Sequence, residues 1–284
     1  MPDVAWNKQK WDGRYHWQDG GDVWSGAWGG PEAQWRHALL PRISAFLPAG
    51  TILEIAPGHG RWTQFLKDRC DRMVLVDLSE QCIASCRRRF ADQRNMSFHV
   101  NDGRSLGMVA DESVDFAFSF DSLVHADADV IESYLGELRR KLRPDGVGFI
   151  HHSNLGEYRR LAWLRRLGPL KGLLKPIVAA GTRTHSRAAD MTASKFERLA
   201  ERAGLRCISQ ELVNWLGRPL IDCLSVFTRR ESAWAGPNRV LRNPDFMREA
   251  EEIRAFVAAS GDPPSATPAG PPPRHEKFSY AKAR

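Results

Sequence analysis

Short apolar runs alternate with amphipathic stretches through the middle of the chain. Five runs are mostly apolar and have the length of buried strands: residues 51–56, 72–77, 96–100, 114–120 and 147–151. Three stretches between them have helical spacing: residues 61–71, 79–90 and 127–142. Because strands that alternate with helices over short connections form a parallel sheet covered on both faces, we predict a doubly wound α/β domain.

The pattern changes after residue 155. Residues 156–190 interrupt the alternation with short helical pieces that prolines limit in length. A helix and two strands follow, with no helix between the strands: residues 192–203, 206–212 and 220–228. Two consecutive strands favour an antiparallel pair. We therefore predict a mostly parallel, seven-stranded sheet with an antiparallel edge strand.

Composition divides the chain around this sheet. Six of the ten tryptophans lie in residues 1–35, where no period is sustained, so we predict an irregular segment that packs over another part of the molecule. Residues 36–230 are the predicted α/β domain, with 156–190 as a basic helical insert. We predict a helical extension over 231–260 and a disordered, proline-rich tail over 261–284.

Charge and cysteine usage exclude several classes of protein. The 284 residues include 41 Lys and Arg against 34 Asp and Glu, a net charge of +7. Residues 157–187 hold eight basic residues and one acid, so the excess is a local patch and not a uniformly basic nucleic-acid-binding surface. Five cysteines without CxxC spacing argue against a disulfide framework or a zinc site. Without a membrane-span or signal-peptide pattern, we expect a cytoplasmic protein.

Glycines and carboxylates gather where the predicted strands end. Pro57-Gly58-His59-Gly60 connects the first strand to a helix, and such a turn brings the backbone close to a ligand. Glu54 lies near the end of the first strand, Asp77 ends the second, and Asp102-Gly103 follows the third. A carboxylate at the second strand end is placed to accept hydrogen bonds from ribose hydroxyls. Thr63 replaces the third glycine of a GxGxxG loop, which argues against a pyrophosphate cradle.

Segments 53–63, 76–79 and 101–103 together resemble the class I S-adenosylmethionine-dependent methyltransferases, a Rossmann-like family. The resemblance covers about residues 40–230 and implies S-adenosylmethionine as the cofactor. It implies that Glu54, Gly58 and Gly60 shape the amino-acid end of the pocket, that Asp77 holds the ribose and that Asp102 meets the adenine. Four further residues complete the implied cofactor set: Ala56, Leu78, Gly103 and Ser119. Many family members have glycine in place of Ala56.

The next two strand ends indicate which kind of atom is methylated. Strand four runs into Asp121 and His125, and strand five into His151 and His152. The Asn/Asp-Pro-Pro-Tyr sequence of amino-methylating nucleic-acid enzymes and a nucleophilic cysteine are both absent there, which favours a hydroxyl acceptor. A hydroxyl needs a base, and we predict His152 or His151, with His125 and Asp121 assisting. Alternatively, Asp121, His151 and His152 bind a divalent cation such as Mg²⁺.

Segments 118–125 and 151–154, behind a tryptophan-rich start, resemble bacterial methyltransferases of glycan and polysaccharide pathways. The resemblance implies O-methylation of a saccharide hydroxyl on a small-molecule or oligosaccharide acceptor, with no stable nucleic-acid partner. The alternatives are O-methylation of a phenolic or polyketide product, RNA 2′-O-methylation, and cofactor binding without activity. The basic insert 156–190 is a solvated face by default, or it contacts an anionic substrate, a membrane surface or a second subunit in a homodimer.

Overall fold

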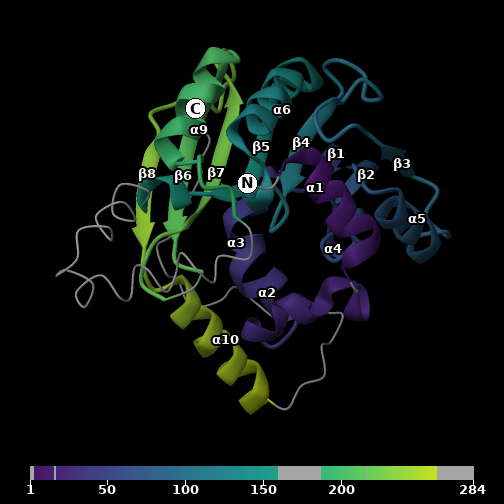
Figure 1. The fold of residues 1–284 in the computed structure, drawn as a ribbon. Helices are drawn as coiled ribbons and strands as arrows, with labels where there is room; N and C mark the ends of the chain where they lie inside the picture. The colour runs from purple at the N-terminus through teal and green to yellow at the C-terminus, as the bar shows by residue number, and fades with distance from the viewer. Residues whose placement is uncertain (1–2, 16, 159–186, 216, 261–284) are drawn as a thin grey trace.

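The computed structural model describes residues 3–15, 17–158, 187–215 and 217–260 (Figure 1). Within these residues, one mixed sheet has the strand order β3-β2-β1-β4-β5-β7-β6-β8. The strands are β1 (Ala49–Ile55), β2 (Cys70–Asp77), β3 (Met96–Val100), β4 (Val114–Ser119), β5 (Leu142–Ser153), β6 (Leu205–Val213), β7 (Asp222–Arg229) and β8 (Arg239–Asn243). The helices are α1 (Val4–Gln9), α2 (Pro31–Gln34), α3 (Leu40–Ile43), α4 (Thr63–Leu66), α5 (Glu80–Arg89), α6 (Ala128–Lys141), α9 (Ala193–Arg202) and α10 (Phe246–Ser260). The predicted doubly wound α/β fold is confirmed.

Five parallel strands end at the same edge of the sheet. β1 pairs with β2 and β4, β2 pairs with β3, and β4 pairs with β5, all in parallel. Ile55 lies opposite Val76, so β1 and β2 end at nearly the same level. The residues that follow these five strands therefore meet at one edge, which is where open parallel sheets bind ligands.

The number of strands and the place of the antiparallel strand differ from the prediction. β7 runs antiparallel between β5 and β6, so it lies inside the sheet and not at its edge. An eighth strand, β8, pairs in parallel with β6 and forms the edge. β8 contains Arg239, Arg242 and the exposed Val240, so its sequence lacks the apolar run of a buried strand. Residues 231–260 accordingly contain this strand as well as α10.

Alternate side chains of the central strands fill two apolar cores, one on each face of the sheet. Leu53 and Ile55 pack in a core that includes residues of α6 and α9. Ile52 and Met73 pack in a second core that includes residues of α3 and α5. Burial of both faces explains why these strands are continuous apolar runs in the sequence.

The helix predicted over residues 61–71 is much shorter in the structure. α4 and a 3-10 turn (Lys67–Arg69) occupy only part of this range. The Gly60 N–H donates to the Pro57 carbonyl, so the turn takes up the residues before α4. Cys70 pairs with Ala49 at the start of β1, and β2 therefore begins before a longer helix could form.

Residues 3–15 and 17–28, called the N-terminal strap below, cross the ligand-binding edge of the sheet. The strap consists of three short helical pieces: α1, a π-helical turn (Lys10–Arg14) and a 3-10 segment (Gln18–Trp28). On one side the Asn7 side chain donates to the His125 carbonyl at 3.2 Å. On the other side the Ser79 hydroxyl donates to Asp12 at 2.5 Å. The strap is thus held to the segments that follow β4 and β2.

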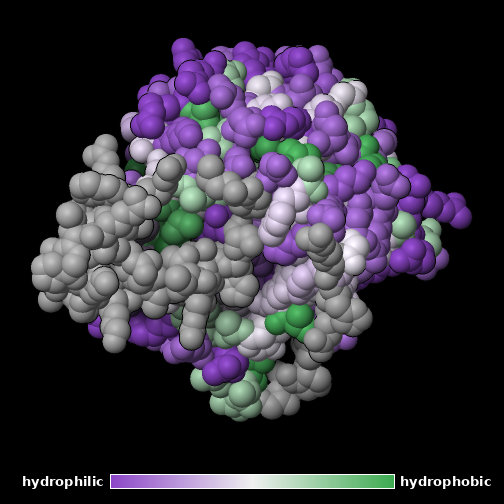
Figure 2. All heavy atoms as spheres, viewed as in Figure 1, coloured by the Kyte–Doolittle hydropathy of each residue, from purple (hydrophilic) through white to green (hydrophobic). Residues whose placement is uncertain are grey.

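The face of the molecule in Figure 2 is mostly hydrophilic where it is described. In the described ranges, no helix combines the length and the apolar character needed to cross a membrane. Most of the predicted basic insert and all of the predicted tail, residues 159–186 and 261–284, lie outside the described residues. Arg187 at the end of the basic patch is buried and paired with Asp222, so this member of the patch does not form a solvated face.

Candidate active site

The turn after β1 has a backbone conformation that allows a ligand to approach closely. Ala56, Gly58 and Gly60 have φ angles of 57°, 59° and 86°, all in the left-handed region. The Ala56 N–H donates to the Val76 carbonyl at 2.7 Å, which ties the turn to β2. A Cβ at Gly60 would lie 2.5 Å from the Phe90 ring, so this glycine is required for packing. Ala56 and Gly58 line the pocket at the end of the sheet, whereas Gly60 does not.

The left-handed φ of Ala56 makes Ala56→Gly a stabilising substitution. This conformation costs an L-residue about 1–2 kcal/mol, while the added freedom of glycine in the unfolded chain takes back part of the gain. We expect the free energy of unfolding to rise by about 0.5–1 kcal/mol in urea titrations. Ala117→Gly in β4 is the matched control and is expected to lower it by a similar amount. A less stable Ala56→Gly variant would contradict this account.

Asp77, the last residue of β2, closes the turn from the opposite side. One carboxylate oxygen accepts the Gly58 N–H at 3.1 Å and the other accepts the Ser79 N–H at 2.9 Å. Burial raises the pKa of Asp77 to about 6, against the opposing effect of these N–H groups. The carboxylate is therefore mostly ionised at pH 7, and it lines the pocket, where it can accept further hydrogen bonds.

Glu54 supports the turn from inside and does not line the pocket. Its carboxyl group accepts the Thr63 hydroxyl at 2.6 Å, and the residue is only 1% exposed. Burial raises the pKa of Glu54 to about 8, although the Thr63 hydroxyl opposes the rise. Contrary to the predicted cofactor contact, the geometry places Glu54 behind the turn, where it fixes the start of α4.

The rest of the predicted cofactor set divides into residues inside and outside the pocket. Leu78 and Gly103 line it, next to Asp77. Asp102 is exposed, and its Oδ1 accepts the N–H groups of the following loop residues Arg104 and Ser105. Ser119 is fully buried within β4. Contrary to the prediction, the structure places Asp102 and Ser119 outside the pocket. The Asp102 carboxylate caps its own loop, and Ser119 is enclosed within the sheet.

Aromatic side chains of the N-terminal strap form the outer wall of the pocket. Trp11, Trp17 and Trp24 line it, with ring centroids 5.4–6.0 Å apart. Trp17 also stacks on His59 at 4.2 Å, and a Cβ at Gly58 would lie 2.8 Å from its ring. The strap therefore covers the glycine turn. The density of tryptophan in residues 1–35 was the sequence signal for this wall, but no spacing rule singled out these three rings.

Asp121 follows β4 and lines the same pocket as the glycine turn. Its Oδ2 accepts Nη2 of Arg61 at 2.7 Å. Arg61 is only 5% exposed, and its guanidinium lies over the rings of Trp24 and Trp62 at 5.3 and 4.5 Å. This ion pair fixes the direction of the carboxylate and leaves it lone pairs for a hydrogen bond to a bound molecule.

His152 belongs to the protein core. Its ring stacks on Phe196 of α9 at 4.2 Å, with Nε2 2.8 Å from the Ser225 hydroxyl and Nδ1 2.9 Å from the Ser153 carbonyl. Burial lowers the pKa of His152 to about 4. The pleat of β5 turns His152 away from its neighbour His151. His152 therefore does not reach the pocket, and its predicted role as the base is wrong.

The buried, uncharged state of His152 makes the fold sensitive to acid. The pKa of His152 is about 4 in the folded protein against an ordinary value of 6.5. Between these two pH values the imidazole is therefore protonated in the unfolded chain but not in the folded protein. Stability is consequently lost as the pH falls from 6.5 to 4, by about 3 kcal/mol at full effect. We expect His152→Gln to remove this pH-dependent component. In urea titrations, the difference in the free energy of unfolding between the parent protein and the variant should then shrink as the pH falls. A difference that stays constant with pH would exclude it.

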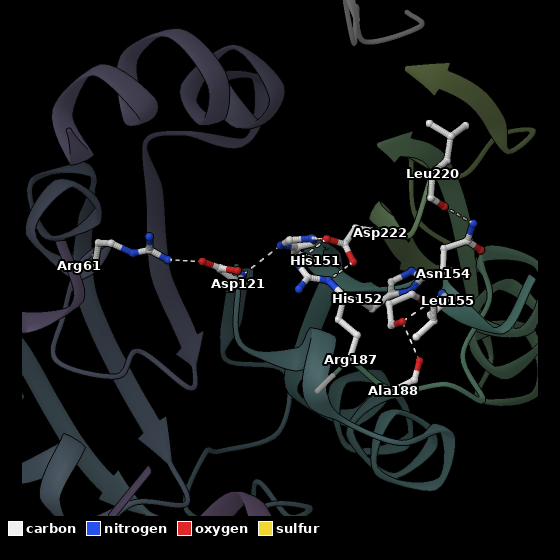
Figure 3. A network of polar contacts seen from close by, with 11 residues as sticks. Arg61, Asp121, His151, His152, Asn154, Leu155, Arg187, Ala188, Leu220 and Asp222 are labelled. Atoms are coloured by element: carbon white, nitrogen blue, oxygen red, sulfur yellow. Dashed lines mark hydrogen bonds and ion pairs between the residues drawn. The ribbon is translucent and has the colours of Figure 1, made fainter. Parts of the chain in front are cut away.

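His151 and His125 lie behind the pocket wall. The His151 ring is fully buried, and its Nδ1 accepts the Asp121 N–H at 3.1 Å (Figure 3). The His125 ring lies 5.5 Å from that of Trp11, and His125 is 7% exposed. Of the four predicted catalytic residues, the structure brings Asp121 alone to the pocket surface.

The three predicted metal ligands do not converge on one point. The Asp121 carboxylate pairs with Arg61, His151 uses Nδ1 for a backbone N–H, and His152 lies on the opposite face of β5. In the part of the chain that the structure describes, no cluster of three or more His, Cys, Asp or Glu residues is arranged to hold a metal ion. The donor set therefore does not fit the Mg²⁺ alternative.

Comparison with known families finds a match in the central part of the chain. Residues 52–146 match the family described as "Methyltransferase domain". This match covers 95 of the 284 residues. It includes the glycine turn, Asp77 and Asp121, and it agrees with the predicted class I fold and with S-adenosylmethionine as the predicted cofactor. The resemblance to glycan methyltransferases stays a prediction.

Curated relatives match the chain over limited segments. "Ribosomal RNA small subunit methyltransferase A" of Coxiella burnetii is 32% identical over 62 residues, 21% of this chain and 24% of that protein. "Phosphoethanolamine N-methyltransferase 1" of Triticum aestivum is 30% identical over 118 residues, 40% of this chain and 24% of that protein. The chain thus spans about a quarter of the length of these relatives. The solved "DhpI-SAH complex" is 18% identical with a TM-score of 0.50, covers 80% of this chain and 95% of its own, and shows the same fold.

Proposed function

We propose that the protein transfers a methyl group from S-adenosylmethionine to a hydroxyl group of a small acceptor, with saccharides as the preferred class. The observation that supports this proposal is the composition of one pocket at the edge of the sheet. The glycine turn, Asp77 and Asp121 all line this pocket, together with indole rings of the N-terminal strap. We assign the glycine turn and Asp77 to the cofactor and Asp121 to the acceptor.

The glycine turn and Asp77 fit S-adenosylmethionine. Gly58 has no side chain, so the Trp17 ring packs directly on the turn, and the Gly58 N–H is held by Asp77. Asp77 would hold the ribose hydroxyls, while Leu78 and Gly103 would border the adenine. When bound, the cofactor supplies an electrophilic methyl group on its sulfonium. The contribution of the chain is to hold the two reactants in line, which is the main source of rate in such transfers.

Asp121 and the indole rings that line the pocket support a hydroxyl acceptor. The Asp121 carboxylate can accept the hydrogen bond of a hydroxyl and take its proton as the oxygen becomes a nucleophile. Arg61 holds that carboxylate in place through the 2.7 Å ion pair. Trp11 and Trp24 line the pocket, and indole rings suit the apolar face of a sugar ring. Asp121 thereby takes the role that the sequence assigned to a histidine.

A second candidate is methylation of an amine. A carboxylate next to indole rings also suits a cationic amine, through an ion pair and cation–π contacts. The wheat relative carries the name of an N-methyltransferase. The same carboxylate would then take a proton from the ammonium group before transfer.

Calorimetry followed by an acceptor screen tests both proposals. We expect S-adenosylmethionine and S-adenosylhomocysteine to bind with micromolar affinity, equally with Mg²⁺ and with EDTA. Transfer of labelled methyl groups is then measured on saccharides, phenols, small amines and a short RNA, and we expect methylated saccharide hydroxyls. Transfer to amines alone would replace the hydroxyl proposal by the second candidate. Absence of cofactor binding would overturn both.

A further inference from the structure

A row of polar contacts leads from the pocket into the interior of the protein (Figure 3). The Asp121 N–H donates to Nδ1 of His151 at 3.1 Å, and Nε2 of His151 lies 3.4 Å from Oδ2 of Asp222. Asp222 accepts both Nε and Nη2 of Arg187, at 2.6 and 2.7 Å. His151 and Asp222 are fully buried and Arg187 is 5% exposed. These three residues do not line the pocket, but their contacts connect them to Asp121, which does.

The contact with Asp121 decides which ring nitrogen of His151 carries a hydrogen. A backbone N–H can only donate, so Nδ1 is the bare accepting nitrogen and Nε2 of the neutral ring carries the hydrogen. Nε2 faces the Asp222 carboxylate, which favours this tautomer. Burial acts to raise the pKa of Asp222, but Arg187 and His151 outweigh it and hold that pKa below its ordinary value. The accepting nitrogen of His151 is thus occupied, so His151 is not placed to take a proton from a bound acceptor.

The backbone at Asp121 needs such an anchor. Its φ of 64° lies in the left-handed region, which non-glycine residues adopt at a cost of about 1–2 kcal/mol and keep only where neighbours enforce it. The His151 ring is itself fixed between Phe120 and Trp215, with centroids at 4.7 and 5.2 Å. Asp121 is therefore held twice, at its N–H by His151 and at its carboxylate by Arg61.

We propose that His151 is a positioning residue: its Nδ1 anchors the Asp121 amide and thereby aims the Asp121 carboxylate at the acceptor. Asp222 and Arg187 serve this role by fixing the tautomer of the ring. The inference rests on the proposed function, because it takes Asp121 as the group that meets the acceptor. A displacement of a reacting group by about 1 Å can cost about a hundredfold in rate, so this anchor affects turnover.

Two substitutions, with side chains of similar size, distinguish the roles of the two ring nitrogens of His151. His151→Asn keeps an accepting oxygen near the position of Nδ1 but loses the Nε2–H group that lies 3.4 Å from Asp222. His151→Gln keeps an N–H near the position of Nε2 but loses the acceptor for Asp121. We expect kcat to fall about thirtyfold in His151→Gln and only about threefold in His151→Asn, with the Kd of S-adenosylmethionine within about twofold of the parent in both. His152→Gln is the matched control in the same strand, expected to lower the Tm while kcat stays within about twofold.

Hydrogen exchange of the full chain gives a readout that does not depend on an acceptor. We expect the Asp121 amide to exchange at least about tenfold faster in His151→Gln than in the parent protein, and nearly at the parent rate in His151→Asn. If no acceptor is methylated, the proposed function fails, while the exchange rates still decide whether His151 anchors Asp121. Equal exchange in both variants, or equal losses of kcat, would overturn the positioning role.

Discussion

Replacing Asp77 by Asn is expected to weaken S-adenosylmethionine binding by about a hundredfold. Hydrogen bonds to a charged acceptor are worth about 1.5–3 kcal/mol each, and about 2.7 kcal/mol corresponds to a hundredfold change in Kd. The amide would also place an NH2 group against one of the two N–H donors, Gly58 or Ser79, that the carboxylate now accepts. The glycine turn would loosen as well, which adds to the loss. Calorimetric titration of the cofactor measures the change.

The pH dependence of cofactor binding provides an independent test of Asp77. Its pKa in the folded protein is raised to about 6, so the carboxylate is charged at pH 7 and becomes protonated as the pH falls below 6. A protonated carboxyl group is the poorer acceptor for ribose hydroxyls. We therefore expect affinity to be lost as the pH falls through 6, and this loss to be absent in Asp77→Asn.

Asp102→Asn is the matched control for Asp77→Asn. It makes the same chemical change in the next strand-end carboxylate, which is exposed and caps its own loop. We expect the Kd of S-adenosylmethionine to stay within about twofold. A hundredfold loss in Asp102→Asn with little change in Asp77→Asn would show that the cofactor lies differently from the orientation proposed.

Asp121→Asn is expected to lower kcat by about a hundredfold to a thousandfold while the Kd of S-adenosylmethionine changes little. Removal of a group that takes a proton typically costs this much. Asn keeps the size of the side chain and an oxygen for Arg61, so the buried guanidinium retains a partner and the fold is preserved. Single-turnover rates and equilibrium binding of the cofactor separate the two effects.

Asp127 supplies the comparison for Asp121. It also lines the pocket and precedes α6, but it has no ion pair comparable to that between Asp121 and Arg61 among the described residues. We expect Asp127→Asn to reduce kcat by less than about threefold. A large loss in Asp127→Asn together with near-normal turnover in Asp121→Asn would transfer the proton-accepting role to Asp127.

The elements predicted best are those whose pattern is local. The apolar runs of β1 and β2 were recognised because both faces of these strands are buried, and the helix over α6 because one stripe of it packs on the sheet. α4 was overestimated because the length of the glycine turn and the start of β2 are decided by strand pairing. β8 was missed because an exposed edge strand needs no apolar run.

In the site, too, features fixed by local sequence were predicted and features fixed by long-range packing were not. Asp77 and Gly58 were predicted as neighbours, since the ends of adjacent parallel strands must meet. His152 was assigned to the pocket because a strand end allows either face, and packing against Phe196 decided between them. Asp102 was assigned to the cofactor because its position along the chain is right, although its carboxylate turns back to cap a loop.

By itself, the sequence determined the α/β order of this protein, the glycine turn after β1 and the carboxylate at the end of β2, because period and spacing act between residues close in the chain. Only the tertiary structure decided that the tryptophans of the strap cover the pocket, that Asp121 and not a histidine faces it, and that Arg187 is buried against Asp222. These features depend on which distant segments meet and on which side of a strand each residue points. Both are settled by packing of the whole chain.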